Sequence, residues 1–187
     1  MTGPDRLSSP IAKTARQQSA PAAFLPDRIR LAPMALVIHP DGQADWRGRS
    51  LRCALGRGGI IDATDKREGD GATPAGRWHF RRALYRADRM NPPATALPLA
   101  PITPEDGWCD DASHADYNRQ VTLPFATSYE HLWRDDALYD LVVVLGHNDD
   151  PPKPGLGSAI FLHVAKPDYA ATEGCVALSN EDLLAVV

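Results

Sequence analysis

YDLVVVLGH at residues 139–147 and SAIFLHVA at residues 158–165 are two continuous apolar runs that decide the expected fold class. Each run is short, rich in β-branched and aromatic residues, and bounded by glycine, proline or aspartate, which is typical of a central strand buried on both faces. Each run also places a histidine at or near its end, His147 in the first and His163 in the second. If the two strands are neighbours in one sheet, both imidazoles could flank one site.

Shorter elements are expected around these two runs. Residues 34–48 hold a Pro-Asp-Gly turn between two extended pieces, which predicts a hairpin at the start of the domain. Residues 90–105 hold many of the prolines, which predicts an irregular and fairly rigid excursion. The remaining expectations are strands over 51–56 and 77–86, a short helix over 128–133, and a short helix over 179–187 that begins with a Ser-x-x-Asp capping pattern. The sequence therefore predicts a mostly β domain with a few short helices.

Length and composition limit the class of protein. A chain of 187 residues and 20.3 kDa suffices for one domain with its own core. Residues 1–33 are rich in Ser, Pro, Ala and Gln without a period, so we expect a flexible leader there and the folded domain at 34–187. The net charge of −4 argues against nucleic-acid binding, which usually needs a basic face. No apolar run approaches the roughly 20 residues of a membrane span, and no secretory signal is visible at the N-terminus.

The sequence offers no cofactor or metal motif. Its three cysteines show no C-x-x-C spacing, so a structural zinc site is not expected. Cys53 and Cys109 could pair in an oxidising compartment, or they could be small core residues. The glycine-rich stretch 66–78 lacks the spacing of a phosphate-binding loop, and the acidic stretch 108–119 lacks a ligand period and is expected to be a solvated loop. The expectation is a protein with no metal and no organic cofactor.

Cys175 has two interpretations. A buried cysteine at a strand end is a common core residue, because free cysteine is among the most buried residue types. Cys175 could instead be a nucleophile, since it precedes the expected helix start at Ser179 by four residues and NH groups of that turn could stabilise a thiolate or form an oxyanion hole. Gly174 would then leave room for a substrate carbonyl. Cys175 alone does not separate these interpretations.

The two strand-end histidines are candidates for a general base. His163 could point into the mouth of a cleft while its strand holds its backbone in place, or it could be a hydrogen-bonded residue at the core edge. His147 could flank the same site, or it could equally cap a turn with Asn148 and Asp149.

The segments HV, TEGCVALSNEDL and GDGATPAGRWHF, taken together, resemble the YkuD-type L,D-transpeptidase catalytic domain over roughly residues 34–187. The family pattern joins a Thr-Pro-x-Gly loop, a strand-end histidine and a Gly-Cys-Val or Gly-Cys-Ile nucleophile. The resemblance implies a β-sandwich with a small helical element. It further implies that Cys175 is the acyl-accepting nucleophile, His163 its base and Gly174 the neighbouring glycine. The expected substrate contacts are His147, Asn148, Glu173 and Val176.

The resemblance also implies the substrate and the place of action. The thiolate of Cys175 would attack an L,D-peptide bond of a peptidoglycan stem peptide, and an amine acceptor would resolve the thioester into a cross-link or an exchanged stem. With water as acceptor the enzyme would be an L,D-carboxypeptidase, and a catalytically silent cell-wall-binding domain is the competing class. The family implies the cell envelope or periplasm. The sequence indicates no oligomeric state.

The chain departs from the usual family pattern at the nucleophile. Many members carry histidine before the Gly-Cys pair and arginine two residues after the cysteine, where this chain has Glu173 and Ala177. Glu173 could recognise the amino group of diaminopimelate, or it could face Cys175 and raise the pKa of its thiol. The chain also ends inside the last expected helix, where the family commonly adds a strand, so either the domain is cut short or its sheet closes differently.

Overall fold

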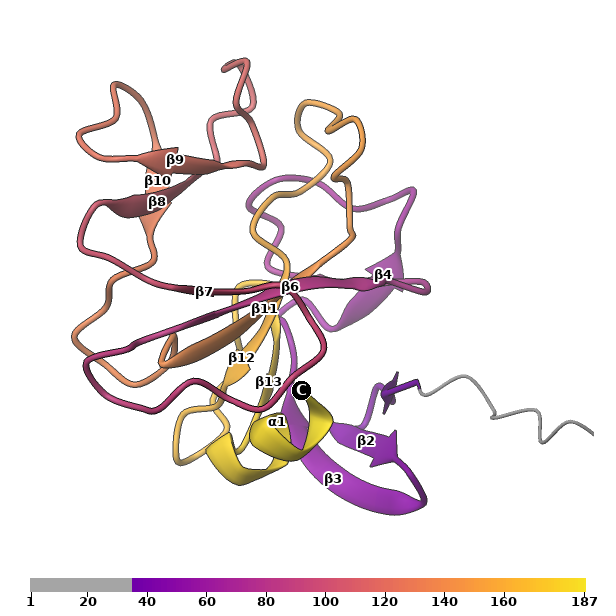
Figure 1. Cartoon of the computed structure of the whole chain (residues 1–187). Helices are drawn as coiled ribbons and strands as arrows, with labels where there is room; N and C mark the ends of the chain where they lie inside the picture. Colours follow the sequence, from indigo (N-terminus) through magenta and orange to yellow (C-terminus); the bar gives the residue numbers. More distant parts are fainter. Residues whose placement is uncertain (1–34) are drawn as a thin grey trace, which may run out of the picture. The chain divides into compact units, whose positions relative to one another are not determined.

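An eight-stranded sheet organises the residues that the computed structural model describes, 35–187; the expected leader at 1–33 lies outside them. The strand order is β1-β2-β3-β13-β12-β11-β6-β7, beside a three-stranded sheet β10-β8-β9 and a two-stranded sheet β4-β5 (Figure 1). The elements are β1 (Val37–Ile38), β2 (Gln43–Trp46), β3 (Arg49–Ala54), β4 (Ile60–Asp62), β5 (Thr73–Ala75), β6 (Phe80–Tyr85), β7 (Leu99–Pro101), β8 (Asp106–Cys109), β9 (Gln120–Thr122), β10 (Tyr129–His131), β11 (Leu141–Leu145), β12 (Phe161–Val164), β13 (Val176–Leu178) and α1 (Asn180–Val186).

The two apolar runs form the centre of the large sheet, as predicted. Strands β11 and β12 are antiparallel neighbours, with Val142 opposite His163. The side chains of β11 alternate between two hydrophobic clusters, so that Leu141 and Val143 enter one and Val142 and Val144 enter the other. Because both faces of these strands are covered, they need no polar side and read as continuous apolar sequence.

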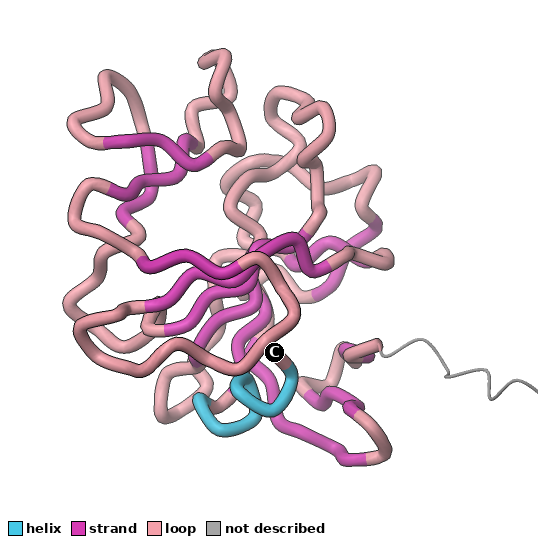
Figure 2. Tube along the Cα trace, in the orientation of Figure 1, coloured by secondary structure: helices cyan, strands magenta, loops and turns pink. Residues whose placement is uncertain are grey.

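The two clusters make the domain a β-sandwich with a small helical element. On one face of the large sheet, α1 contributes Leu183 and Val186 to the first cluster. On the other face, Trp108 of β8 packs edge-on against Phe161 of β12, with ring centroids 5.0 Å apart, and so ties the three-stranded sheet to the second cluster. Figure 2 shows that strands and loops make up nearly all of the described chain, in agreement with the expected mostly β class.

The ends of the domain follow the local signals in the sequence. The stretch 34–48 contains the antiparallel pair β1 and β2, as expected for the hairpin, and the strand expected over 51–56 overlaps β3 at residues 51–54. At the other end, the Ser179 hydroxyl accepts a hydrogen bond from the Asp182 backbone N–H at 3.0 Å, which is the predicted cap of α1. Among the described residues, α1 is the only α-helix, and it is not long and apolar enough to span a membrane.

The short helix predicted over 128–133 is wrong. Residues Tyr129–His131 form β10, in which Glu130 pairs with Trp108 of β8. The aromatic and polar residues of this stretch are compatible with either conformation, and the backbone partner supplied by β8 decides for the strand.

Candidate active site

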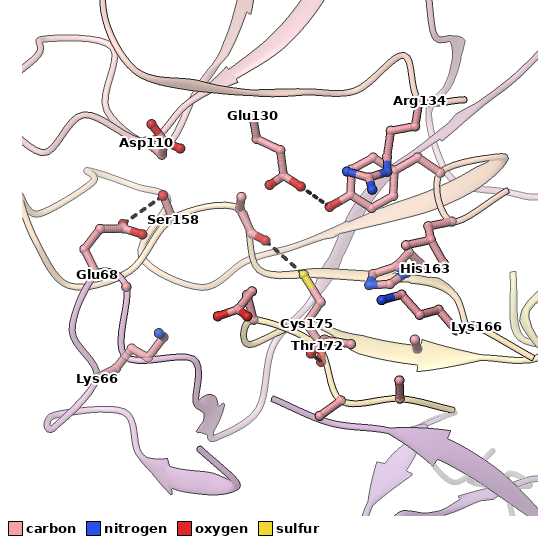
Figure 3. Close-up of a pocket in the computed structure, with 18 residues that line it drawn as sticks. Lys66, Glu68, Asp110, Glu130, Arg134, Ser158, His163, Lys166, Thr172 and Cys175 are labelled. Carbon is pink, nitrogen blue, oxygen red and sulfur yellow. Dashed lines mark hydrogen bonds between the residues drawn. The ribbon is translucent and has the colours of Figure 1, made fainter. Parts of the chain in front are cut away.

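A cavity of about 560 Å³ opens on the face of the large sheet that carries the second hydrophobic cluster, and it contains the predicted nucleophile and base (Figure 3). Its walls come from four parts of the chain. They include Lys66 and Glu68 from the β4–β5 connection, Asp110 and Glu130 from the three-stranded sheet and its edge, Arg134 and Tyr139 from the connection before β11, and Ser158, His163, Lys166, Thr172, Glu173, Cys175 and Ala177 from the β12–β13 region.

Strand register places Cys175 and His163 on the same face. Strands β12 and β13 are parallel, and His163 is paired with Ala177. Side chains of paired residues lie on the same face, and residues two apart in a strand share a face, so Cys175 immediately before β13 also points into the cavity. Val176 points to the opposite face and belongs to the first hydrophobic cluster. The structure therefore gives Val176 a core position and places it outside the cavity lining.

The thiol of Cys175 is enclosed by backbone groups. Its Sγ donates to the Ala159 carbonyl at 3.1 Å and accepts from the Phe161 N–H at 3.3 Å, and the residue is only 9% exposed. Burial, with a smaller contribution from the charge of Glu130, raises the pKa of the Cys175 thiol to about 12. In the resting cavity the sulfur is a neutral thiol.

The helix terminus expected to activate Cys175 lies elsewhere. All of β13 separates Cys175 from the N-cap Ser179, and a three-residue strand extends roughly 10 Å. The NH groups of the first turn of α1 therefore cannot face the sulfur, because the effect of a helix terminus falls off within its own turn. The sequence spacing of four residues was correct, but an extended conformation makes it a long distance.

His163 is a buried neutral imidazole with one fixed nitrogen. Its Nδ1 lies 2.8 Å from the Val164 carbonyl, which can only accept, so Nδ1 carries the proton and Nε2 is the basic nitrogen. Burial lowers the pKa of His163 to about 4. The ring of Tyr139 packs against the imidazole with centroids 5.3 Å apart. Tautomer and orientation are thus both set before a substrate enters, as a general base requires.

Gly174 is required by close packing of the backbone. Its φ of +136° is one that residues with a side chain rarely adopt, and a Cβ there would lie 2.9 Å from the Ala72 carbonyl oxygen. Ala72 precedes the Thr-Pro pair, and Thr73 accepts a hydrogen bond from the Gly56 N–H at 2.9 Å. The glycine-rich loop thus supports the backbone just before Cys175.

Thr172 fixes the same segment and was not singled out from the sequence. Its hydroxyl donates to the Cys175 carbonyl at 2.6 Å and accepts from the Gly174 N–H at 3.2 Å. A threonine that bonds to backbone two or three residues ahead is a common turn motif, and the Thr-x-Gly-Cys spacing is the signal that could have revealed it.

His147 and Asn148 lie in a second pocket, of about 280 Å³, which Cys175 does not line. Neighbouring antiparallel strands run in opposite directions. The C-terminal ends of β11 and β12, where the two histidines lie, are therefore at opposite ends of the strand pair. The Nε2 of His147 lies 3.0 Å from the Leu156 carbonyl, and the side chain of Asn148 bonds to the backbone of Lys153. These contacts match the alternative interpretation, in which the pair stabilises a turn.

Glu173 lies at the rim of the cavity and is already paired. Its carboxylate is 2.8 Å from Nε of Arg57, and its side chain is 78% exposed. Ala177, at the other position where the usual pattern differs, is 1% exposed and stands beside His163. A long side chain is thus absent next to the imidazole, and Lys166 and Arg134 are the cations that line this part of the cavity.

All three cysteines are free and buried, so Cys53 and Cys109 are small core residues. Cys53 belongs to β3 of the large sheet, whereas Cys109 ends β8 of the three-stranded sheet. Within the described part of the chain, no group of three or more His, Cys, Asp or Glu side chains could hold a metal ion.

Comparison with known proteins identifies the family. The family model of the L,D-transpeptidase catalytic domain, YkuD, matches residues 29–187, which is most of the chain. Neither the curated proteins nor the solved structures yield a match. The extent of the family match is sufficient to conclude that this chain belongs to the YkuD L,D-transpeptidase family.

Proposed function

We propose that this chain is a peptidoglycan L,D-transpeptidase that acts through a thioacyl intermediate on Cys175. Membership of the YkuD family indicates L,D-transpeptidase chemistry on peptidoglycan. The observation that carries the proposal is the position of Cys175 and His163. They come from neighbouring strand segments of the large sheet, and both side chains enter one cavity from the same face. Among the cysteines, Cys175 alone lines this cavity.

The acylation step follows from the two neutral groups. As Sγ of Cys175 attacks the carbonyl carbon of the L,D-peptide bond, the thiol proton passes to Nε2 of His163. The tetrahedral oxyanion is stabilised by backbone N–H groups, for which we propose the N–H of Cys175 as one donor. The C–N bond then breaks, and the imidazolium returns its proton to the departing amine of the D-residue. The product of this half-reaction is a thioester on Cys175.

The second half-reaction restores the thiol. An amine of another stem peptide attacks the thioester carbon and loses a proton to His163. The C–S bond then breaks, and the sulfur takes that proton back. Cross-linking or stem-peptide exchange results. Water in place of the amine would give L,D-carboxypeptidase activity, which uses the same groups. The family places this reaction in the cell envelope or periplasm, and we propose the same location here.

Glu173 keeps a proposed role as a substrate contact at the cavity rim. Its carboxylate is paired with Arg57, and most of the side chain is exposed, so it stays open to a substrate from the solvent side. For His147, Asn148 and Val176 the contacts described above support structural roles.

Covalent labelling tests the proposal against the competing class, a silent wall-binding domain. The full chain is treated with a carbapenem, and the intact mass and the modified peptide are determined. One adduct on Cys175 is expected, together with release of the terminal D-residue from a stem tetrapeptide. Cys175→Ala should lose both while keeping its circular dichroism spectrum, because no other group can replace the thiolate. Cys109→Ala serves as the matched control and should keep both. Turnover in purified Cys175→Ala would refute the mechanism.

A further inference from the structure

Asn118 joins three separate parts of the chain through one buried side chain. Its Oδ1 accepts hydrogen bonds from Nε1 of Trp108 at 2.9 Å and from the Ala159 N–H at 3.0 Å. Its Nδ2 donates to the carbonyls of His147 at 3.1 Å and of Asn148 at 2.7 Å. The amide thus makes all four hydrogen bonds of which it is capable. It links the three-stranded sheet to the turn after β11 and to the segment before β12.

The stretch 108–119 is not a solvated loop at its ends, and that expectation is wrong there. Trp108 and Cys109 at its start, and Tyr117 and Asn118 near its end, are buried, with Asn118 only 7% exposed. Asn118 also has φ of +56°, in the left-handed region where asparagine is enriched among residues with a side chain. A buried amide with four partners is a rigid support for the groups that it bonds.

Ala159 connects this support to Cys175. Its N–H is bonded to Asn118, and its carbonyl accepts the hydrogen bond from Sγ of Cys175 at 3.1 Å. Ala159 has φ of +51°, a conformation that a residue with a Cβ keeps only where its surroundings fix it. The hydrogen bond to Asn118 is such a constraint. The orientation of the carbonyl that receives the thiol proton therefore depends on Asn118.

We propose that Asn118 is a positioning residue for Cys175: it fixes the backbone of Ala159, so that the Ala159 carbonyl holds the thiol proton and sets the direction of the S–H bond. The Phe161 N–H, which donates to the same sulfur at 3.3 Å, is the second backbone contact at the thiol. The consequence for catalysis rests on the proposed function, whereas the contacts at the thiol do not.

The bond to Ala159 defines the state from which Cys175 reacts. A thiol that donates to a carbonyl is stabilised in its protonated form, because a thiolate would face the carbonyl oxygen with no proton between them. In the proposed acylation step the same proton passes to Nε2 of His163, so the S–H bond first has to rotate away from Ala159. In the view of Figure 3 the hydrogen bond leaves the sulfur on the side opposite His163.

The S–H stretching band of Cys175 measures this hydrogen bond directly. A hydrogen bond weakens the S–H bond of its donor and lowers the stretching frequency. Difference infrared spectra of the full chain against Cys175→Ala, Cys53→Ala and Cys109→Ala isolate the three bands. Cys175 should have the lowest frequency, because its sulfur lies 3.1 Å from its carbonyl acceptor, whereas Cys53 and Cys109 lie 3.5 and 4.0 Å from theirs. A Cys175 band at or above either of the others would overturn the proposal.

Two substitutions of Asn118 separate its bond to Ala159 from the bonds that it donates. Asn118→Gly suits the positive φ but removes the amide, so the Cys175 band should move to higher frequency. Asn118→Asp keeps an oxygen that accepts from the Ala159 N–H and loses the donated bonds, so the band should stay near its original position. Equal shifts in both variants, or no shift in either, would overturn the proposal.

Val121→Ala is the matched control for a loss of stability in the same sheet. Val121 is buried in β9, carries no polar group and does not line the cavity, so this variant should leave the Cys175 band unchanged. A shift as large as that in Asn118→Gly would mean that the band follows general loosening of the fold, and the specific role of Asn118 would be rejected.

Iodoacetamide alkylation, followed on the Cys175 peptide by mass spectrometry, gives the size of the effect. In Asn118→Gly the rate at neutral pH should rise roughly two- to tenfold and the pH profile should move to lower pH, as expected when one hydrogen bond to the protonated form is lost. The charge of Glu130 raises the pKa of the Cys175 thiol, that of Lys66 lowers it, and Tyr139 and His163 line the same cavity. Asn118→Gly leaves these four groups in place. An unchanged profile would contradict the proposal.

Carbapenem labelling of the unmodified chain separates this inference from the proposed function. Labelled Cys175 without the low-frequency band would reject the positioning role and keep the transpeptidase. The expected band, together with its shift in Asn118→Gly but without labelling or turnover, would keep the positioning role and favour a wall-binding protein.

Discussion

Gly174→Ala is the substitution whose effect the structure defines most closely. Two costs add at this position. The φ of +136° is strained for any residue with a Cβ, which costs about 1–3 kcal/mol. The new Cβ would also lie 2.9 Å from the Ala72 carbonyl and 3.3 Å from Cδ1 of Ile160, and the first of these neighbours is backbone that cannot rotate away. Overpacking of this kind costs about 1–3 kcal/mol, so together the two costs predict a loss of roughly 2–6 kcal/mol in the free energy of unfolding.

Gly48→Ala isolates the conformational cost. Gly48 has φ of +77° in the turn between β2 and β3, and a Cβ there would meet no atom within 4 Å. Its loss should be about 1 kcal/mol. Urea unfolding followed by circular dichroism gives both free energies under the same conditions. Equal losses in the two variants would refute the argument that the Thr-Pro loop holds the nucleophile segment by backbone contact.

Three further predictions concern the charged and titrating groups. His163→Ala should lower turnover by around 10²–10⁴-fold, as expected for a removed general base, and His147→Ala should cost less because its ring lies outside the cavity; the opposite ranking in steady-state kinetics would reassign the base. Glu173→Gln should leave the pH profile of iodoacetamide reaction at Cys175 unchanged, because Arg57 already compensates that charge; a clear shift to lower pH would show that Glu173 acts on the sulfur. The pKa of His163 is about 4 in the fold and near 6.5 when unfolded, so the unfolded chain binds the proton more tightly and stability falls as pH drops from 6.5 to 4. The loss in the free energy of unfolding at pH 4 should be about 3 kcal/mol larger in the unmodified chain than in His163→Gln. Urea titrations of both proteins across this pH range measure the loss, and equal losses would contradict the prediction.

The fold was predictable where the local sequence permits one conformation. The runs that contain β11 and β12 are too apolar for any exposed face. The capping pattern that starts at Ser179 is typical of the start of a helix. Residues 128–133 gave no such constraint, and their strand depends on β8, about twenty residues earlier in the chain. Sequence patterns describe a segment and its nearest neighbours, whereas pairing between distant strands is decided by the whole fold.

The same limit explains the candidate site. Cys175 and His163 were predicted because the family motif contains both of them. The role expected for His147 required β11 and β12 to end at the same edge, and their antiparallel pairing places the two ends apart. The carboxylates of Asp110 and Glu130 could not be assigned to the cavity, because nothing in their own segments indicates that the three-stranded sheet faces the nucleophile.

In the mechanism that we propose, ionisation of Cys175 has to accompany the attack on the substrate, with His163 as the proton acceptor. The N-terminus of α1, the only α-helix of the described residues, does not reach the sulfur, burial keeps the thiol neutral, and His163 is neutral as well. A neutral thiol is a poor nucleophile, but it is also slow to oxidise, because oxidation proceeds through the thiolate. At the envelope location that we propose, where disulfides form readily, a thiol that stays neutral until substrate is bound would be protected from oxidation.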